Sequence, residues 1–290
     1  MNPARRAHDS VSDGLSGPIP PQTSSRTLDE LVASLQYEGY ALYPYTPGAL
    51  KNATPTPFGI VYPPVYAAQC AGGFDHARLE CVAEAGEGAM LNATLRYLAP
   101  SGERHQAQER RVELSRVAIG ERRTVDFPGG RLTLRSEALD GGQTLVRSCV
   151  HNTRQVQAGL DRRAALADSL ISTHVVLTIS AGRFISPLDS GRESVNIWPV
   201  LATPSDDAVL GAAIVLPDHP QIAAQSRGNL FDNTEIEEAL VLHVHALSDS
   251  ERDQAAGQDP VVAAMLQRAL ATTPEEIIGL HSGLKAVSDG

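Results

Sequence analysis

Apolar and polar residues alternate with a period of two over residues 74–156. In residues 76–85 every second side chain is apolar, and the intervening positions include Arg78, Glu80 and Glu84. Residues 91–97 repeat the pattern. This alternation is typical of β-strands with one buried face. The apolar positions of the two segments are Ala77, Leu79, Cys81, Ala83, Ala85, Leu91, Ala93, Leu95 and Tyr97.

Clusters of turn-forming residues separate the predicted strands. Asp126 to Gly130 and Asp140 to Gly142 have the composition of hairpin turns. The apolar parity changes between Leu114 and Val117, which predicts a β-bulge. Short strands joined by such turns predict an antiparallel β-sandwich.

The second half of the chain combines short apolar runs with loop residues. Residues 159–170 predict a short helix, and residues 172–180 predict a strand that ends at Ala181 and Gly182. In residues 182–238, apolar runs too short for helices are interrupted by Pro, Gly, Asp and Asn. We therefore expect strands and constrained loops here. Trp198 is predicted to plug the end of the sandwich or, alternatively, to anchor an interface.

The N-terminal part divides into three segments. Residues 1–26 are rich in Ser and Pro and are predicted to form a disordered tail. Thr27 and Glu30 have the spacing of a capping box, which predicts a helix that ends at Gln36. Residues 37–66 hold six of the seven tyrosines and six prolines. Because proline lacks an N–H, this segment is predicted to form an extended ribbon that covers the core or, alternatively, lines a partner-binding groove.

The C-terminal part is expected to become helical. Residues 235–247 fit either a strand or a helical stripe, and we favour a strand because Ser248 and Glu251 form a capping box directly afterwards. Prolines at positions 260 and 274 each follow a capping residue. The sequence thus predicts a sandwich domain over residues 27–247, with a helical segment, residues 248–290, packed on it.

Composition excludes several classes of function. The formal net charge of −10 argues against a nucleic-acid partner, since phosphate binding needs a basic surface. The arginine pairs at positions 110, 122 and 162 are interpreted as solvated surface. Three cysteines without CxxC spacing predict neither a disulfide framework nor a zinc knuckle, and fit a reducing cytoplasm. No apolar run has the length of a membrane span or of a signal peptide.

One set of residues has the types found in metal sites: Asp218, His219, His243 and His245. Two histidines separated by one residue share a face only on a strand, so the metal hypothesis depends on the strand interpretation of residues 235–247. The alternative is that Asp218 and Asp232 accept hydrogen bonds within their turns and that the histidines are surface residues.

Nucleophilic and cofactor chemistry find little support. The chain has no Gly-x-Ser-x-Gly elbow and no phosphate-binding glycine loop, so no cofactor is expected. Cys149 and His151 lie two residues apart in a predicted strand, and we interpret them as core residues rather than as a catalytic pair.

Several segments from Glu38 onwards resemble a bacterial protein family associated with nickel-iron hydrogenase gene clusters. The matching pieces are EGYALYPYTPGALKN, FGIVYPPVYA, the strand ending in HNT at residues 151–153, STHVVLTISAGRFISPLD, NIWPVLA, IVLPDHPQIA and SRGNLFDNTEIEEAL. The chain departs from the family pattern at Thr46, where the family has a basic residue, and at Ala212 and Ala213, where it has Ser-Pro. A nucleophile at the first of these alanines is therefore excluded.

The resemblance implies a non-enzymatic accessory or scaffold protein that assists assembly, maturation or docking of a hydrogenase or similar redox complex. Its partners would be hydrogenase subunits or maturation factors. The alternative is a metal-dependent hydrolase or metal carrier, and a carbohydrate-binding sandwich is a third hypothesis. The expected partner surface consists of Tyr40, Tyr43, Tyr45, Trp198, Asp218, His219, Phe231, Asp232 and Glu235.

Overall fold

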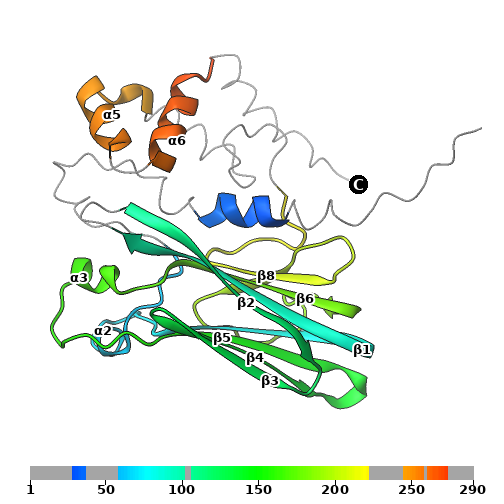
Figure 1. The fold of residues 1–290 in the computed structure, drawn as a ribbon. Coiled ribbons are helices and arrows are strands. Elements are labelled where there is room, and N and C mark those ends of the chain that lie inside the picture. The colour runs from blue at the N-terminus through cyan, green and yellow to red at the C-terminus, as the bar shows by residue number, and fades with distance from the viewer. Residues whose placement is uncertain (1–27, 37–57, 102–105, 222–243, 258–259, 274–290) are drawn as a thin grey trace, which may run out of the picture.

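The computed structural model describes residues 28–36, 58–101, 106–221, 244–257 and 260–273 (Figure 1). This part of the chain is mainly β. The strands are β1 (His76–Ser101), β2 (Gln106–Ala118), β3 (Arg122–Phe127), β4 (Gly130–Ala138), β5 (Thr144–Asn152), β6 (Ile171–Ile185), β7 (Trp198–Leu201) and β8 (Ala208–Ala212). The helices with named bounds are α2 (Pro64–Ala67), α3 (Arg162–Ala167), α5 (Asp249–Ala256) and α6 (Pro260–Leu270), and residues 28–36 are also helical.

All eight strands belong to one antiparallel sheet with the order β3-β4-β5-β1-β6-β8-β7, and β2 pairs with β1. The long strand β1 pairs with β5 through its first half and with β2 through its second half, and β6 runs along its other edge. The sheet therefore forks on one side of β1. The predicted mainly β, antiparallel architecture is confirmed, whereas the sandwich is not, because the strands form a single sheet that is not closed.

The two predicted strands at residues 76–85 and 91–97 are one strand. β1 continues through Gly86 and Gly88 because β6 pairs with it on both sides of this point. β6 likewise passes the expected end at Ala181 and Gly182 and runs on to Ile185. Ala181 has a φ of 52°, so the strand kinks there and continues. The predicted end of this strand is thus a bend within the longer strand β6.

The predicted β-bulge is confirmed. Leu91 lies opposite Val117 and Ala93 lies opposite Leu114, so two residues of β2 face Asn92 alone. Arg116, one of these two, has a φ of 57°, and its N–H donates to Asn92 Oδ1 at 2.9 Å. Because of the extra residue, the apolar side chains before and after the bulge, Leu114 and Val117, both point into the core.

The main core lies on the inner face of the forked sheet. Its members come from both branches, for example Leu134 of β4, Leu95 of β1 and Leu177 of β6. A second cluster forms where the helix at residues 28–36 packs Leu31 and Val32 on the outer face of β6 and β8. The predicted helix is confirmed, although Thr27 lies outside the described residues. Buried Arg96 holds this helix by donating to Asp29 O at 2.8 Å.

A predicted helix, the tyrosine- and proline-rich ribbon and an apolar run expected to form a strand differ from their predictions. α3 begins after Asp161, whose Oδ1 accepts the N–H of Ala164 at 2.8 Å, and it ends at Ala167, so it is shorter than expected. Of the tyrosine- and proline-rich ribbon, residues 37–57 lie outside the described residues. Its remainder joins the sheet through a bridge between Val61 and Leu170 and then forms α2. The apolar run at residues 214–217 forms no strand, contrary to expectation.

The C-terminal helices begin where the capping signals predict, but the strand predicted before them is not observed among the described residues. Ser248 Oγ accepts from the Glu251 N–H at 3.4 Å, and Glu251 Oε2 accepts from the Ser248 N–H at 2.8 Å, which completes the capping box of α5. α6 begins at Pro260 as predicted, while residues 274–290 are not described. Residues 244–246 are α-helical, so the strand interpretation is wrong there; residues 235–243 lie outside the described part. No helix among the described residues is long and apolar enough to cross a membrane.

Candidate functional site

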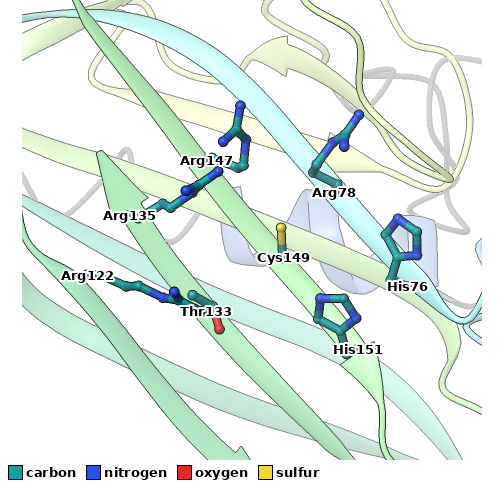
Figure 2. Close-up of a pocket in the computed structure, with 8 residues that line it drawn as sticks. All are labelled: His76, Arg78, Arg122, Thr133, Arg135, Arg147, Cys149 and His151. Atoms are coloured by element: carbon teal, nitrogen blue, oxygen red, sulfur yellow. The ribbon is translucent and has the colours of Figure 1, made fainter. Parts of the chain in front are cut away.

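A basic pocket lies on the outer face of the sheet, over β3, β4, β5 and the first half of β1 (Figure 2). Strand alternation sends Leu132, Leu134, Val146 and Val150 into the inner core, so their neighbours in sequence point outward. The pocket has a volume of about 470 Å³. Its lining residues are His76, Arg78, Arg122, Thr133, Arg135, Arg147, Cys149 and His151.

The strand register arranges these side chains in rows that cross the strands. Arg122 lies opposite Arg135, and Arg135 lies opposite Arg147. We call these three residues the arginine row; Glu80, opposite Arg147, ends it. Directly opposed residues have Cβ atoms about 4.5–5.5 Å apart, and like charges in such positions repel. The protein therefore keeps three guanidinium groups together at a cost in stability.

Glu80 is the carboxylate that partly neutralises this face. Its Oε1 lies 2.6 Å from Arg147 Nε and 3.3 Å from Arg78 Nε, and the side chain is only 10% exposed. Arg78 Nε is buried, and no atom in the described part of the chain hydrogen-bonds to it with suitable geometry. Arg122 and Arg135 pair with no carboxylate of the described residues. The four arginines of the pocket and the carboxylate of Glu80 together carry a net charge of +3, although the formal net charge of the whole chain is −10.

A pair of stacked histidines forms the opposite wall. His76 and His151 are directly opposed across β1 and β5, and their ring centroids are 5.4 Å apart. His76 Nδ1 lies 2.8 Å from Asp75 Oδ1. Burial, followed by the nearby His76, holds the pKa of His151 below its ordinary value. His151 is therefore neutral at neutral pH and gains charge only as the solution becomes acidic.

The floor of the pocket is uncharged. Figure 2 shows Cys149 between the arginines and the two histidines, with Thr133 beside it on β4. Thr133 Oγ1 is 3.1 Å from the hydroxyl of Thr124. Burial raises the pKa of the Cys149 thiol, although Arg147 and Arg78 act in the opposite direction. Because the thiolate is the nucleophilic form, this cysteine is not activated. The pocket can therefore offer positive charge and hydrogen bonds to an anion.

The interpretation of Cys149 and His151 as core residues is wrong. Both point to the outer face, whereas Val146 and Val150 of the same strand enter the core. The arginine pair at position 122 is also divided, because only Arg122 lines the pocket, and Arg123 Nε lies 3.8 Å from Glu121. A usable signal was present in the sequence, since Arg131, Arg135 and Arg147 all occupy the polar parity of two neighbouring strands.

Asp218 and His219 have structural partners. Asp218 Oδ2 accepts the hydroxyl proton of Ser186 at 2.5 Å, and Oδ1 accepts the N–H of Leu201 at 2.8 Å. His219, with a φ of 55°, places Nε2 at 2.8 Å from Asp206 Oδ1. Asp218 thus accepts a backbone hydrogen bond, but its donor is Leu201 of β7, 17 residues away, and not a residue of its own turn as expected. Trp198 is 45% exposed, so it does not plug the core.

The other expected site residues are not brought together in the described part of the chain. His245 lies in the helical turn at residues 244–246, so the strand face required for the metal hypothesis is missing at this histidine. Within the described ranges, no group of three or more His, Cys, Asp and Glu residues could hold a metal ion. The remaining residues lie outside the described ranges: Tyr40, Tyr43, Tyr45, Phe231, Asp232, Glu235 and His243.

Comparison with known proteins adds no relative. No protein-family model matches the chain, and no curated protein matches it. The resemblance to the hydrogenase-associated family is therefore still a prediction, and the pocket must be interpreted from its own chemistry.

Proposed function

We propose that this chain is a non-enzymatic binding protein that takes up an anionic ligand in its basic pocket. The observation that carries the proposal is the arginine row, three guanidinium groups opposed across three strands with one carboxylate at its end. Guanidinium groups bind carboxylate and phosphate oxygens through two parallel hydrogen bonds. An anion in the pocket would relieve the repulsion that the register imposes.

Binding is favoured over turnover by the state of the groups in the pocket. Cys149 is held as a thiol by burial, and its neighbours Thr133 and Thr124 share their hydroxyl hydrogen bond with each other. The lining thus provides recognition without an activated nucleophile.

Isothermal titration calorimetry with sulfate, phosphate and citrate tests the proposal. We expect binding by at least one of these anions, its loss in Arg135→Glu and its retention in Arg123→Glu. Arg123 is a matched control because it is an exposed arginine of the same sheet that lies outside the pocket. Absence of binding by every anion, or equal loss in both variants, would contradict the proposal.

A second candidate is the accessory role implied by the family resemblance, in which the protein docks on a hydrogenase subunit or a maturation factor. Among the residues expected to form the partner surface, Trp198 supports this role, because it is an exposed aromatic residue on the sheet-edge strand β7. Aromatic residues of this kind often dominate interface energetics. Co-purification with co-expressed hydrogenase subunits should be weakened by Trp198→Ala and not by Leu270→Ala, another exposed apolar residue. Absence of co-purification would reject this role.

A further inference from the structure

The charges around the pocket are distributed unevenly. Arg131, next to the pocket on β4, is satisfied by Asp126, with Nε to Oδ1 at 2.6 Å and Nη2 to Oδ2 at 3.3 Å. Arg147 and Arg78 share Glu80. Arg122 and Arg135 have no such partner among the described residues. The uncompensated charge is therefore concentrated over β3 and β4, and Glu80 closes the other end of the arginine row.

The spacing of the strands sets the size of the ligand that can use this charge. Neighbouring strands lie about 4.8 Å apart, so the arginine row on β3, β4 and β5 spans about 10 Å. The pocket volume of about 470 Å³ accommodates a small molecule rather than a folded chain. A single carboxylate could engage one or two of the guanidinium groups and would leave the others opposed.

The surroundings disfavour a long polyanion. The chain as a whole carries a net charge of −10, and Glu137 lies on β4, two residues beyond Arg135. A nucleic-acid strand that extended beyond the pocket would meet this negative field, whereas a ligand confined to the pocket would meet a local excess of three positive charges.

We infer that the ligand is a compact polyanion, a small molecule that carries two or three negative charges within about 10 Å, the span of the arginine row. Both a phosphorylated small molecule and a di- or tricarboxylate meet this description, because their shared chemistry is closely spaced oxyanions. This inference rests on the proposed anion-binding function and specifies the charge and size of its ligand. One oxyanion group of the ligand engages Arg122 and Arg135, and the next lies toward Arg147 and Arg78.

A calorimetric series at constant ionic strength and neutral pH tests the inference. The carboxylate arm contains acetate, succinate and citrate, and the phosphorus arm contains phosphate and diphosphate. Because each added charged hydrogen bond contributes substantially, we expect citrate or diphosphate to bind about tenfold or more tightly than acetate. The tighter arm identifies the ligand as a carboxylate or a phosphate compound.

Three variants connect the series to named residues. Arg122→Gln and Arg135→Gln should each reduce the preference for the trivalent anion, whereas Arg123→Gln should leave it unchanged. All three arginines are exposed, so we expect each variant to fold, and circular dichroism checks this.

Each remaining outcome is decisive. Acetate binding as tightly as citrate and diphosphate would overturn the inference and leave the proposed anion binding intact. Failure of every anion to bind would overturn both. Tighter binding of a single-stranded oligonucleotide than of either trivalent anion would overturn the compact ligand in favour of nucleic acid.

Discussion

His174 gives the clearest prediction about stability because it is a fully buried titratable group with one unpaired nitrogen. Nδ1 lies 2.9 Å from the carbonyl oxygen of Ser172, and buried Nε2 has no hydrogen-bond partner among the residues that the structure describes. Burial lowers the pKa of His174 to about 4, with a smaller contribution in the same direction from the charge of Arg96, its cross-strand neighbour on β1. The folded protein therefore holds this imidazole neutral.

The magnitude follows from linkage. The folded pKa is below the ordinary value of 6.5, so the unfolded chain binds the proton more readily, and stability falls as the pH drops below about 6.5. Between about pH 7.5 and pH 5 the free energy of unfolding should decrease by about 2 kcal/mol on account of this residue alone. The loss approaches about 3 kcal/mol at the folded pKa and below it.

The assay is urea unfolding followed by circular dichroism across this pH range. His174→Asn should be less stable at neutral pH, because it loses packing, but should lack the part of the pH dependence that His174 causes. His245→Asn, which removes an exposed histidine, should keep the wild-type profile. An unchanged pH profile in His174→Asn would refute the reasoning, since the orphaned imidazole would then not be the group that titrates.

Three further predictions concern the pocket and the sheet. Glu80→Gln should lower the free energy of unfolding by about 2 kcal/mol, because Arg147 and Arg78 lose their carboxylate. The same change removes a negative charge from the pocket, so it should tighten sulfate binding in calorimetry. Weaker sulfate binding would contradict the charge argument. His151→Asn should weaken the tightening of sulfate binding that we expect as the pH falls below the ordinary histidine range, since its imidazole adds positive charge to the pocket there. A profile equal to wild type would exclude this histidine. Gly182→Ala should destabilise the fold by about 2 kcal/mol in thermal unfolding, because a Cβ atom there would lie 2.7 Å from the backbone oxygen of Glu84. An unchanged melting temperature would contradict this contact.

Local signals in the sequence were sufficient for much of the fold. The alternation around Leu79 and Leu95, the parity change before Val117 and the Ser248–Glu251 box each depend on residues close together in the chain, and each corresponds to an observed element. The forked sheet could not be predicted in this way. It requires β1 to change partners from β5 to β2 while β6 continues along its other edge, and this depends on pairings between distant segments.

The pocket was missed for the same reason. Arg122, Arg135 and Arg147 become neighbours only through the register of three strands, and the sequence places them in separate segments. The residues singled out by their chemical type, Asp218 and His219, instead stabilise loops through Ser186, Leu201 and Asp206. Residue type therefore indicated possible chemistry, while register decided which side chains meet.

The most direct test of anion binding by the pocket is nuclear magnetic resonance of the arginine Nε–H groups during titration with diphosphate. The account predicts saturable shifts for Arg122, Arg135 and Arg147, with Arg123 and Arg131 unaffected. Shifts spread evenly over all arginines, or confined to residues outside the pocket, would contradict it.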